Sequence, residues 1–211
     1  RSLKRVTSEP VSEFFLDLHR QWGVDVLLAC ELHTINRLSH GYSATTKDGR
    51  QINFDFMVVG VGVVPNQELA EQSGLQCDNG ILTNEFAETD DPDVYAIGDC
   101  CNAMSTVYQR RIRLESIPNA TVQAKVVASS ILGDRKPSQD IPWFWSDQYD
   151  VKLQTIGLVN KYDSLKIDGD PQVKKFAVNY YKGGELIAVD AVNYPKAYIA
   201  GKKSIAEISR Q

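Results

Sequence analysis

Apolar side chains recur every three or four residues over positions 11–22, and Gly23 follows the last of them. This spacing is that of an amphipathic helix with one buried face, and Ser8 and Pro10 provide a helix start. The aliphatic run VDVLLA at 24–29 follows at once and predicts a strand. Together the two segments predict the helix-to-strand half of a βαβ unit.

Short strand patterns separated by turn residues occupy the next part of the chain. LHTINRL at 32–38 predicts a strand, and YSATTKDGRQINF at 42–54 predicts a hairpin. The hairpin turn is Asp48-Gly49, because both central positions accept left-handed dihedrals. FMVVGVGVV at 56–64 is apolar without interruption and predicts a fully buried strand.

The central region alternates predicted helices and strands. A short helix is expected over 67–75, and GILTNEF at 80–86 and DVYAIGD at 93–99 are expected as strands. From Ser116 onward, small and aliphatic residues at helical spacing predict a longer helix, with Pro118 at its start and a glycine beyond its end.

The pattern changes after the stretch RKPSQDIP. Three segments rich in β-branched and aromatic residues predict strands at 151–159, 174–181 and 185–193, and a final helix is expected over 197–208. We therefore predict an α/β part followed by a small antiparallel α+β part, divided near residue 146.

Composition narrows the function classes. The 211 residues are 43% hydrophobic and 24% charged, which suits a globular protein, and the formal charge of −4 with a pI near 5.4 argues against nucleic-acid binding. No apolar run approaches the roughly 18 residues of a membrane span, and the basic start RSLKR leads into acidic residues instead of a signal-peptide core. We expect a cytoplasmic protein, and the lack of an initial methionine suggests a fragment.

Cysteine and histidine give no sign of a metal or acid–base centre. Cys30, Cys77, Cys100 and Cys101 have no Cys-x-x-Cys spacing, so we expect reduced structural thiols. The three histidines, His19, His33 and His40, are expected at the surface or in the core. No catalytic side chain and no metal ligand is predicted.

Asp99 is the residue whose position most needs an explanation. It follows an apolar segment in DPDVYAIGDCC, and a carboxylate there is costly to desolvate unless donors meet it. In open α/β sheets ligands bind beyond the carboxyl ends of strands, where Asp99 would accept hydroxyl donors of a polyol. Amides near Ile117 at the next helix start would meet a carbonyl or anionic edge of the same ligand. These features suggest a flavin, with a simple turn at Asp99 as the open alternative.

Several stretches together resemble one family. TDDPDVYAIGDC, with VVGVGVVPN before it and RLESIPNA and PWFWSDQYD after it, is similar to the flavin-dependent ferredoxin reductases, a group that includes rubredoxin and putidaredoxin reductases. The ending AVNYPKAYIAGKK adds to this resemblance, which runs through nearly the whole chain. The glycine fingerprint for dinucleotides is absent, because Pro65 occupies the place of its third glycine.

The resemblance implies a site and a domain plan. Asp99 would hold the FAD ribitol, the backbone at Ile117 would contact the isoalloxazine, and Trp145 would lie beside the flavin. Glu115 would face the nicotinamide. Gly62 is the fifth residue expected to bind a cofactor. Residues 1–62 would be the end of an NAD(P)-binding domain, 63–146 the second half of an FAD-binding domain, and 147–211 a carboxy-terminal interface domain. The implied fold is two partial Rossmann-like domains followed by a small α+β domain.

The implied function is electron transfer from NAD(P)H through FAD to an iron–sulfur carrier such as a ferredoxin or rubredoxin, with a homodimer as a further possibility. Both cofactors would need the amino-terminal part that the relatives carry, so the isolated chain is expected to be inactive. The basic cluster Arg110, Arg111 and Arg113 is a candidate for steering an acidic carrier. Two alternatives stay open, a non-catalytic interaction or dimerisation module and a disulfide reductase of the same wider group.

Overall fold

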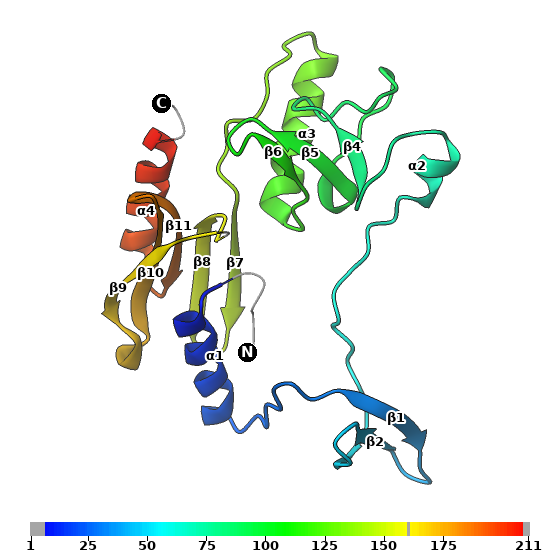
Figure 1. Ribbon diagram of the computed structural model, residues 1–211, viewed down its shortest axis with the longest axis vertical. Helices are drawn as coiled ribbons and strands as arrows, with labels where there is room; N and C mark the ends of the chain where they lie inside the picture. Colours follow the sequence, from blue (N-terminus) through cyan, green and yellow to red (C-terminus); the bar gives the residue numbers. More distant parts are fainter. Residues whose placement is uncertain (1–6, 160, 209–211) are drawn as a thin grey trace. The chain divides into compact units, whose positions relative to one another are not determined.

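The computed structural model describes residues 7–159 and 161–208 (Figure 1). It divides into two compact units, Arg1–Val63 and Val64–Gln211, and each is described by itself. Residues 1–5, the basic start that was one reason to expect a cytoplasmic location, lie outside the described residues. Within the described ranges, no helix has the length and apolar character that crossing a membrane requires.

The first unit begins with the predicted amphipathic helix. Helix α1 spans Glu9–Gln21, with a proline in its first turn, and buries Val11, Phe15 and Leu18, three residues of the expected apolar face. Proline fits there because the first-turn amides of a helix have no partner within it. The prediction of this helix is confirmed.

A three-stranded antiparallel sheet follows in the order β1-β2-β3. Its strands are β1 (Leu32–Arg37), β2 (Tyr42–Thr46) and β3 (Gln51–Phe54). The predicted turn joins β2 to β3: Gly49 has a φ of 87°, and the Thr46 hydroxyl accepts a hydrogen bond from the Arg50 amide at 2.9 Å. The predicted hairpin is therefore confirmed.

Two predicted strands in this part of the chain are wrong. Residues 24–29 form no strand, and residues 56–64 run without regular structure, with Val58 and Val61 more than four-fifths exposed. A strand exists only where a neighbour accepts and donates its backbone hydrogen bonds, and no described residue pairs with either segment. The apolar composition of both segments is real, but the described residues do not supply a pairing partner.

The second unit opens with a short helix and a small mixed sheet. Helix α2 is Glu68–Gln72, within the range expected for a helix. Strand β4 (Ile81–Thr83) pairs in parallel with β5 (Cys101–Ser105), which pairs antiparallel with β6 (Arg110–Ile112). The predicted long helix is α3, Ile117–Ile131, with Ser116 as its N-cap and Gly133 just past its end.

The predicted strand at 93–99 is the third correction. Only Tyr95 forms an isolated bridge, to Glu88, and the chain then turns through the 3-10 helix η1, Gly98–Cys100. The described residues again offer no neighbouring strand for this segment. Asp99 therefore lies in a helical turn and not at the end of a sheet strand.

The carboxy-terminal part is a five-stranded antiparallel sheet in the order β7-β8-β11-β10-β9 (Figure 1). Its elements are β7 (Trp143–Gln148), β8 (Val151–Gly157), β9 (Ser164–Asp170), the 3-10 turn η2 (Pro171–Val173), β10 (Lys175–Lys182), β11 (Glu185–Val192) and α4 (Pro195–Ile208). Strands β8, β10 and β11 and the final helix were predicted, whereas β7 and β9 were not.

Helix α4 packs on this sheet through a core of aliphatic side chains that includes Ile156, Val189 and Ile205. Gly201 allows the close approach, because a Cβ built there would lie 2.5 Å from a methyl of Val189. Trp143 and Tyr198 pack against the same core. This packing stabilises the five-stranded sheet, whose edge strand β7 contacts α3.

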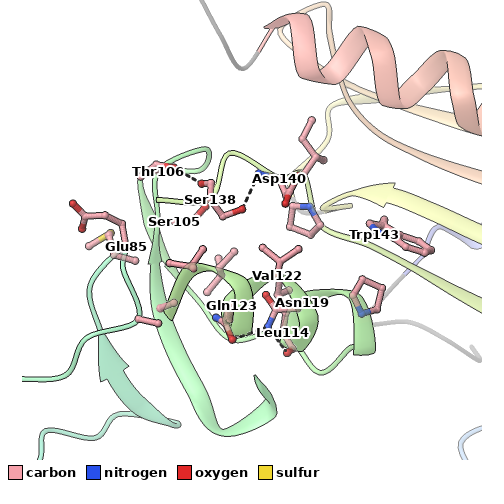
Figure 2. A pocket seen from close by; sticks show the side chains of 18 of the residues that line it. Glu85, Ser105, Thr106, Leu114, Asn119, Val122, Gln123, Ser138, Asp140 and Trp143 are labelled. Carbon is pink, nitrogen blue, oxygen red and sulfur yellow. Dashed lines mark hydrogen bonds between the residues drawn. The ribbon is translucent and has the colours of Figure 1, made fainter. Parts of the chain in front are cut away.

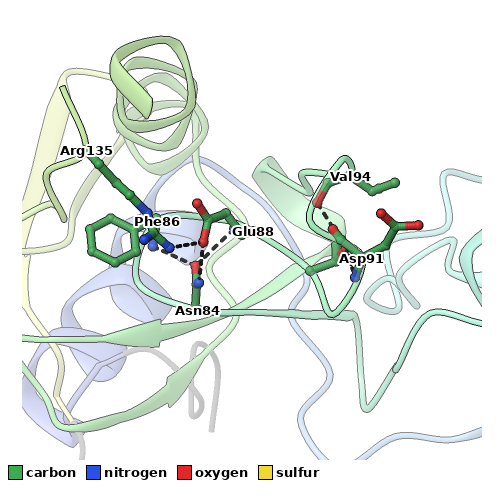
Figure 3. Close-up of polar contacts among 7 residues, drawn as sticks. Asn84, Phe86, Glu88, Asp91, Val94 and Arg135 are labelled. Carbon is green, nitrogen blue, oxygen red and sulfur yellow. Dashed lines mark hydrogen bonds and ion pairs between the residues drawn. The ribbon is translucent and has the colours of Figure 1, made fainter. Parts of the chain in front are cut away.

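A polar cluster fixes the loop between β4 and η1 (Figure 3). The Asn84 carboxamide accepts hydrogen bonds from the amides of Phe86 and Glu88 at 2.9 and 3.1 Å, and donates to the Glu88 carboxylate at 2.7 Å. The Arg135 guanidinium pairs with Glu88 and lies 4.2 Å from the Phe86 ring centroid. Arg135 follows α3, so the cluster ties the loop to the end of that helix.

Candidate functional site

The turn that carries Asp99 depends on a glycine conformation and on a hydrogen bond to a side chain of α3. Gly98 adopts a φ of 79°, which glycine reaches without the steric cost of a Cβ, and its amide donates to the Gln123 side-chain oxygen at 2.7 Å. The Asp99 side chain is exposed and its carboxylate has no hydrogen-bond or ion-pair partner among the described residues. It does not accept local amides, as the simple-turn alternative would require.

The start of α3 presents one free backbone donor. The Ser116 hydroxyl accepts from the Asn119 amide at 3.3 Å, and Pro118 has no N–H. The Ile117 amide is then the first-turn donor for which no described residue is an acceptor. The Ile117 side chain is 71% exposed, so it lies outside the core.

These groups meet in one cleft of about 390 Å³. Strand β7 forms part of its wall through Phe144 and Trp145, and Trp145 is 40% exposed although its ring lies 5.6 Å from that of Trp143. The residues that line the cleft are Asp99, Glu115, Ser116, Ile117, Pro118, Ala120, Phe144 and Trp145. The structure thus brings together four of the five predicted site residues.

Gly62 is the fifth predicted residue, and it is not among those that line the cleft. It belongs to the first unit, in the extended segment with a φ of 100°. Its assignment stays a prediction.

Arg113 forms hydrogen bonds with two residues that line the cleft but does not line it itself. Its Nη1 donates to the Asp99 carbonyl oxygen at 3.0 Å and to the Glu115 carboxylate at 2.7 Å. The Arg113 side chain is only 13% exposed, whereas that of Glu115 is 42% exposed. One buried cation therefore holds the turn of Asp99 and the segment before α3 at a fixed spacing.

The arginine cluster is mostly used inside the fold. The Arg111 guanidinium donates to the carbonyls of Thr83 and Asn102 at 2.8 and 2.9 Å. Arg113 pairs with Glu115, whereas Arg110 and Arg111 are exposed and have no ion-pair partner among the described residues. Two of the three arginines of the predicted steering surface therefore remain exposed and without a carboxylate partner.

A second, smaller cavity of about 190 Å³ shares Pro118 with the cleft (Figure 2). Val122 and Gln123 of α3 face it together with Trp143, while Ser138 and Asp140 border it from the linker before β7. This volume is below the roughly 300 Å³ of ordinary small-molecule sites. We therefore regard the cleft at Asp99 as the candidate site.

All four cysteines are free thiols, and Cys101 is buried. Burial raises the pKa of Cys101, against a hydrogen bond with Thr83 that lowers it, so the thiol stays protonated at neutral pH. Among the described residues, no group of three or more His, Cys, Asp or Glu side chains is arranged to hold a metal ion. The chemistry of the cleft rests on carboxylate, amide and aromatic groups.

The cleft fits the ring and the polyol of a flavin. An unpaired carboxylate suits hydroxyl donors, a free amide at a helix start suits a ring carbonyl, and Trp145 and Phe144 supply apolar surface for the ring. A pyrophosphate, in contrast, has no glycine-rich cradle in this sequence. The residues present thus match half of an FAD-binding site.

Comparison with known proteins agrees with this interpretation. A sequence profile described as pyridine nucleotide-disulphide oxidoreductase matches residues 1–124, more than half of the chain. The chain belongs to the pyridine nucleotide-disulphide oxidoreductase family. A second profile, described as reductase C-terminal, matches residues 143–210, which cover the five-stranded sheet and α4.

Relatives of this family are similar over nearly the whole chain. Putidaredoxin reductase CamA of Pseudomonas putida is 39% identical over 210 residues, which cover 98% of this chain and 50% of the relative. Rhodocoxin reductase of Rhodococcus erythropolis is 37% identical over 207 residues, 98% of this chain and 48% of the relative. The chain spans about half the length of the curated relatives it matches.

Solved structures of the family have the same fold. The ferredoxin reductase for the CYP199A2 system of Rhodopseudomonas palustris superimposes with a TM-score of 0.93 at 37% identity, over 96% of this chain and 50% of that one. The reductase in a covalent putidaredoxin reductase–putidaredoxin complex gives 0.93 at 38% identity, over 98% and 50%. The predicted fold class, partial Rossmann-like domains followed by a small α+β domain, is confirmed.

The contacts of three residues at the candidate site were not predicted from the sequence. Phe144 lines the cleft, and the aromatic run WFW was the available signal. Arg113 and Gln123 act through backbone groups of the Asp99 turn. No spacing in the sequence indicates such contacts, because they join residues 14 and 25 positions apart.

Proposed function

We propose that the chain is the carboxy-terminal part of a flavoprotein oxidoreductase that passes electrons from NAD(P)H through FAD to an iron–sulfur protein. The observation that carries the proposal is the cleft that unites Asp99, Glu115, Ile117 and Trp145. The names of the relatives, putidaredoxin and rubredoxin reductases among them, support the same activity. The chain spans about half the length of these relatives, which supports a role as one part of such an oxidoreductase.

Four residues of the cleft have defined roles in this proposal. Asp99 accepts hydrogen bonds from ribitol hydroxyls, the Ile117 amide donates to a carbonyl of the isoalloxazine, and Trp145 covers an edge of the ring and keeps water away. Glu115 lies toward the nicotinamide side. FAD supplies the hydride and single-electron chemistry when bound, so none of these residues has to act as a general acid or base.

The domain plan is part of the proposal. Residues 1–62 would be the end of the NAD(P)-binding domain, 63–146 the second half of the FAD-binding domain and 147–211 the interface domain. The matches of the two family profiles, 1–124 and 143–210, support a change of domain near the start of β7.

The electron acceptor would be a ferredoxin- or rubredoxin-like carrier. One related solved structure is a covalent complex of putidaredoxin reductase with putidaredoxin, which supports a carrier of this class. Arg110 is exposed and makes no ion pair among the described residues, so it can attract an acidic partner at low salt. Dimerisation and a cytoplasmic location belong to the same proposal.

Reconstitution tests the proposal directly. A protein of the relatives' length that contains this chain should purify yellow, and NAD(P)H should reduce its flavin and then an added ferredoxin or rubredoxin. Arg110→Glu should raise the KM for the carrier at low salt and leave flavin reduction by NAD(P)H unchanged. A colourless protein with no affinity for added FAD would contradict the proposal.

A further inference from the structure

The Arg113 side chain is largely buried, and its neighbours satisfy only some of its hydrogen-bond donors. Its side chain is 13% exposed, and its Nε is buried without a hydrogen-bond partner among the described residues. Leaving a buried donor unpaired costs on the order of 1 to 3 kcal/mol. Such a cost persists only where the rest of the side chain is held in place for another reason.

That reason lies in the two bonds of Nη1. It donates at once to the Asp99 carbonyl, 3.0 Å away, and to the Glu115 carboxylate, 2.7 Å away. Asp99 and Glu115 both line the cleft, whereas Arg113 does not. Arg113 therefore touches two walls of the cleft without reaching its interior.

The fold makes room for this arginine at a defined place. Gly80 has a φ of 121°, and a Cβ added there would lie 2.9 Å from the Arg113 Cδ and 2.8 Å from the Cys100 carbonyl oxygen. The Gly80 amide is in turn held by the Gln67 side chain at 2.6 Å. The backbone at Gly80 thus packs closely against the Arg113 side chain.

Charge adds to the geometry. Glu115 directs a carboxylate toward the cleft, and the Arg113 guanidinium, bonded to it, offsets that negative charge. Removal of Arg113 would leave Glu115 without its cation and free to change rotamer. It would also release the Asp99 carbonyl, and with it the turn that directs the Asp99 side chain.

We propose that Arg113 is a positioning residue of the flavin cleft, which sets the placement of Asp99 and Glu115 relative to each other. The inference rests on the proposed function, because it concerns the same cleft. It adds a residue that contacts neither flavin nor nicotinamide and acts through the two that do.

The first test uses the 211-residue chain without ligand. In Arg113→Met, the backbone amide resonances of residues 98–100 and 115 should shift, and their hydrogen exchange should accelerate about tenfold or more. Arg110→Met is the matched control, because Arg110 lies three residues before Arg113, at the start of β6, but is exposed, and it should leave these amides unchanged. Unmoved amides in Arg113→Met would overturn the proposal.

The second test is a double-mutant cycle on FAD affinity in the holoprotein of the relatives' length. Arg113→Met should weaken FAD binding about five- to tenfold, which is the size expected for losing a charge-assisted brace. In the Asp99→Ala background the same change should have little further effect, because the carboxylate that Arg113 positions is gone. Arg113→Lys should recover part of the affinity, since a lysine reaches one acceptor but lacks the planar fork.

The outcomes separate the two claims. Additive losses in the cycle would show Arg113 to be merely structural and would overturn the inference, even with flavin bound. A wild-type holoprotein that binds no FAD would contradict the proposed function instead, and the amide test on the free chain would still decide whether Arg113 holds the Asp99 turn.

Discussion

At the scale of single residues, Asp99 decides how the cleft is understood. Its carboxylate is exposed, lines the cleft and has no partner among the described residues, so it adds nothing visible to the stability of the turn. The turn is held instead by the Gly98 amide and the Asp99 carbonyl. A carboxylate kept free in this way is available to a ligand.

Replacing this carboxylate should therefore affect binding and not folding. In a protein of the relatives' length, Asp99→Ala should weaken FAD affinity by roughly ten- to a hundredfold, the worth of a charge-assisted hydrogen bond to a polyol hydroxyl. The melting temperature of the apoprotein should stay the same. Asp93→Ala, in the exposed part of the same loop, is the control and should change neither quantity. A lowered melting temperature with unchanged affinity would make Asp99 a turn residue.

Tyr108 predicts a pH dependence of stability. Its burial in the β5–β6 hairpin turn raises its pKa to about 12, whereas a tyrosine in an unfolded chain ionises near 10. Above pH 10 the unfolded state loses the Tyr108 proton first, so the free energy of unfolding should fall by about 2 to 3 kcal/mol between pH 10 and 12. Below pH 10 the contribution is fully present.

Denaturant titrations at several alkaline pH values check this. Tyr108→Phe should remove most of the fall between pH 10 and 12, because phenylalanine has no proton to lose. Tyr42→Phe serves as the comparison, since Tyr42 is 36% exposed and belongs to the other unit. Equal slopes for wild type and Tyr108→Phe would refute the assignment.

Half of the residues that line the candidate site were predicted from the sequence, and the full set of four depended on the resemblance. Asp99, Glu115, Ile117 and Trp145 were named there and meet in the cleft. From strand and helix patterns alone, Asp99 and the Ile117 amide were the two that could be argued. The contacts of Arg113 and Gln123 with the Asp99 turn were predicted by neither, because they join residues far apart in the sequence.

At the scale of elements, helices and hairpins were predicted correctly from local sequence, whereas strands that need a partner distant in the sequence were not. Helices α1, α3 and α4 and the two hairpins β2–β3 and β10–β11 follow from spacing, caps and glycine turns close in sequence. The segments 56–64 and 93–99 were predicted as strands, yet form none, because pairing depends on distant partners. Relatives twice as long have further chain from which such partners can come.

Helix α4 offers a prediction at this scale. Gly201 lies within the helix, where glycine-to-alanine usually stabilises by up to about 1 kcal/mol. Here the new methyl would meet Val189 at 2.5 Å, so Gly201→Ala should instead destabilise the protein by about 1 to 3 kcal/mol. Thermal melts should show a fall of several degrees. Ser204→Ala, on the exposed side of α4, should melt like the wild type, and a Gly201→Ala variant that does the same would show that the helix is not packed this closely.

At the scale of the whole molecule, the cleft accounts for one end of FAD and not the other. In the proposed site, the ring and polyol would have partners in Trp145, the Ile117 amide and Asp99, which line the cleft, whereas the pyrophosphate has no glycine-rich loop in this sequence. A helix start and one carboxylate cannot replace that cradle. The isolated chain should consequently recognise a flavin weakly but in the right place.

A titration of the isotope-labelled chain with FAD, followed by NMR, tests this central claim most directly. The account predicts a dissociation constant weaker than about 1 µM, as expected when the pyrophosphate is not bound. It also predicts that the indole N–H of Trp145 and the amides of Asp99 and Ile117 shift as FAD is added, while the exposed Trp22 in the first unit does not. Submicromolar affinity, or millimolar FAD that leaves Trp145, Asp99 and Ile117 unmoved, would contradict the account.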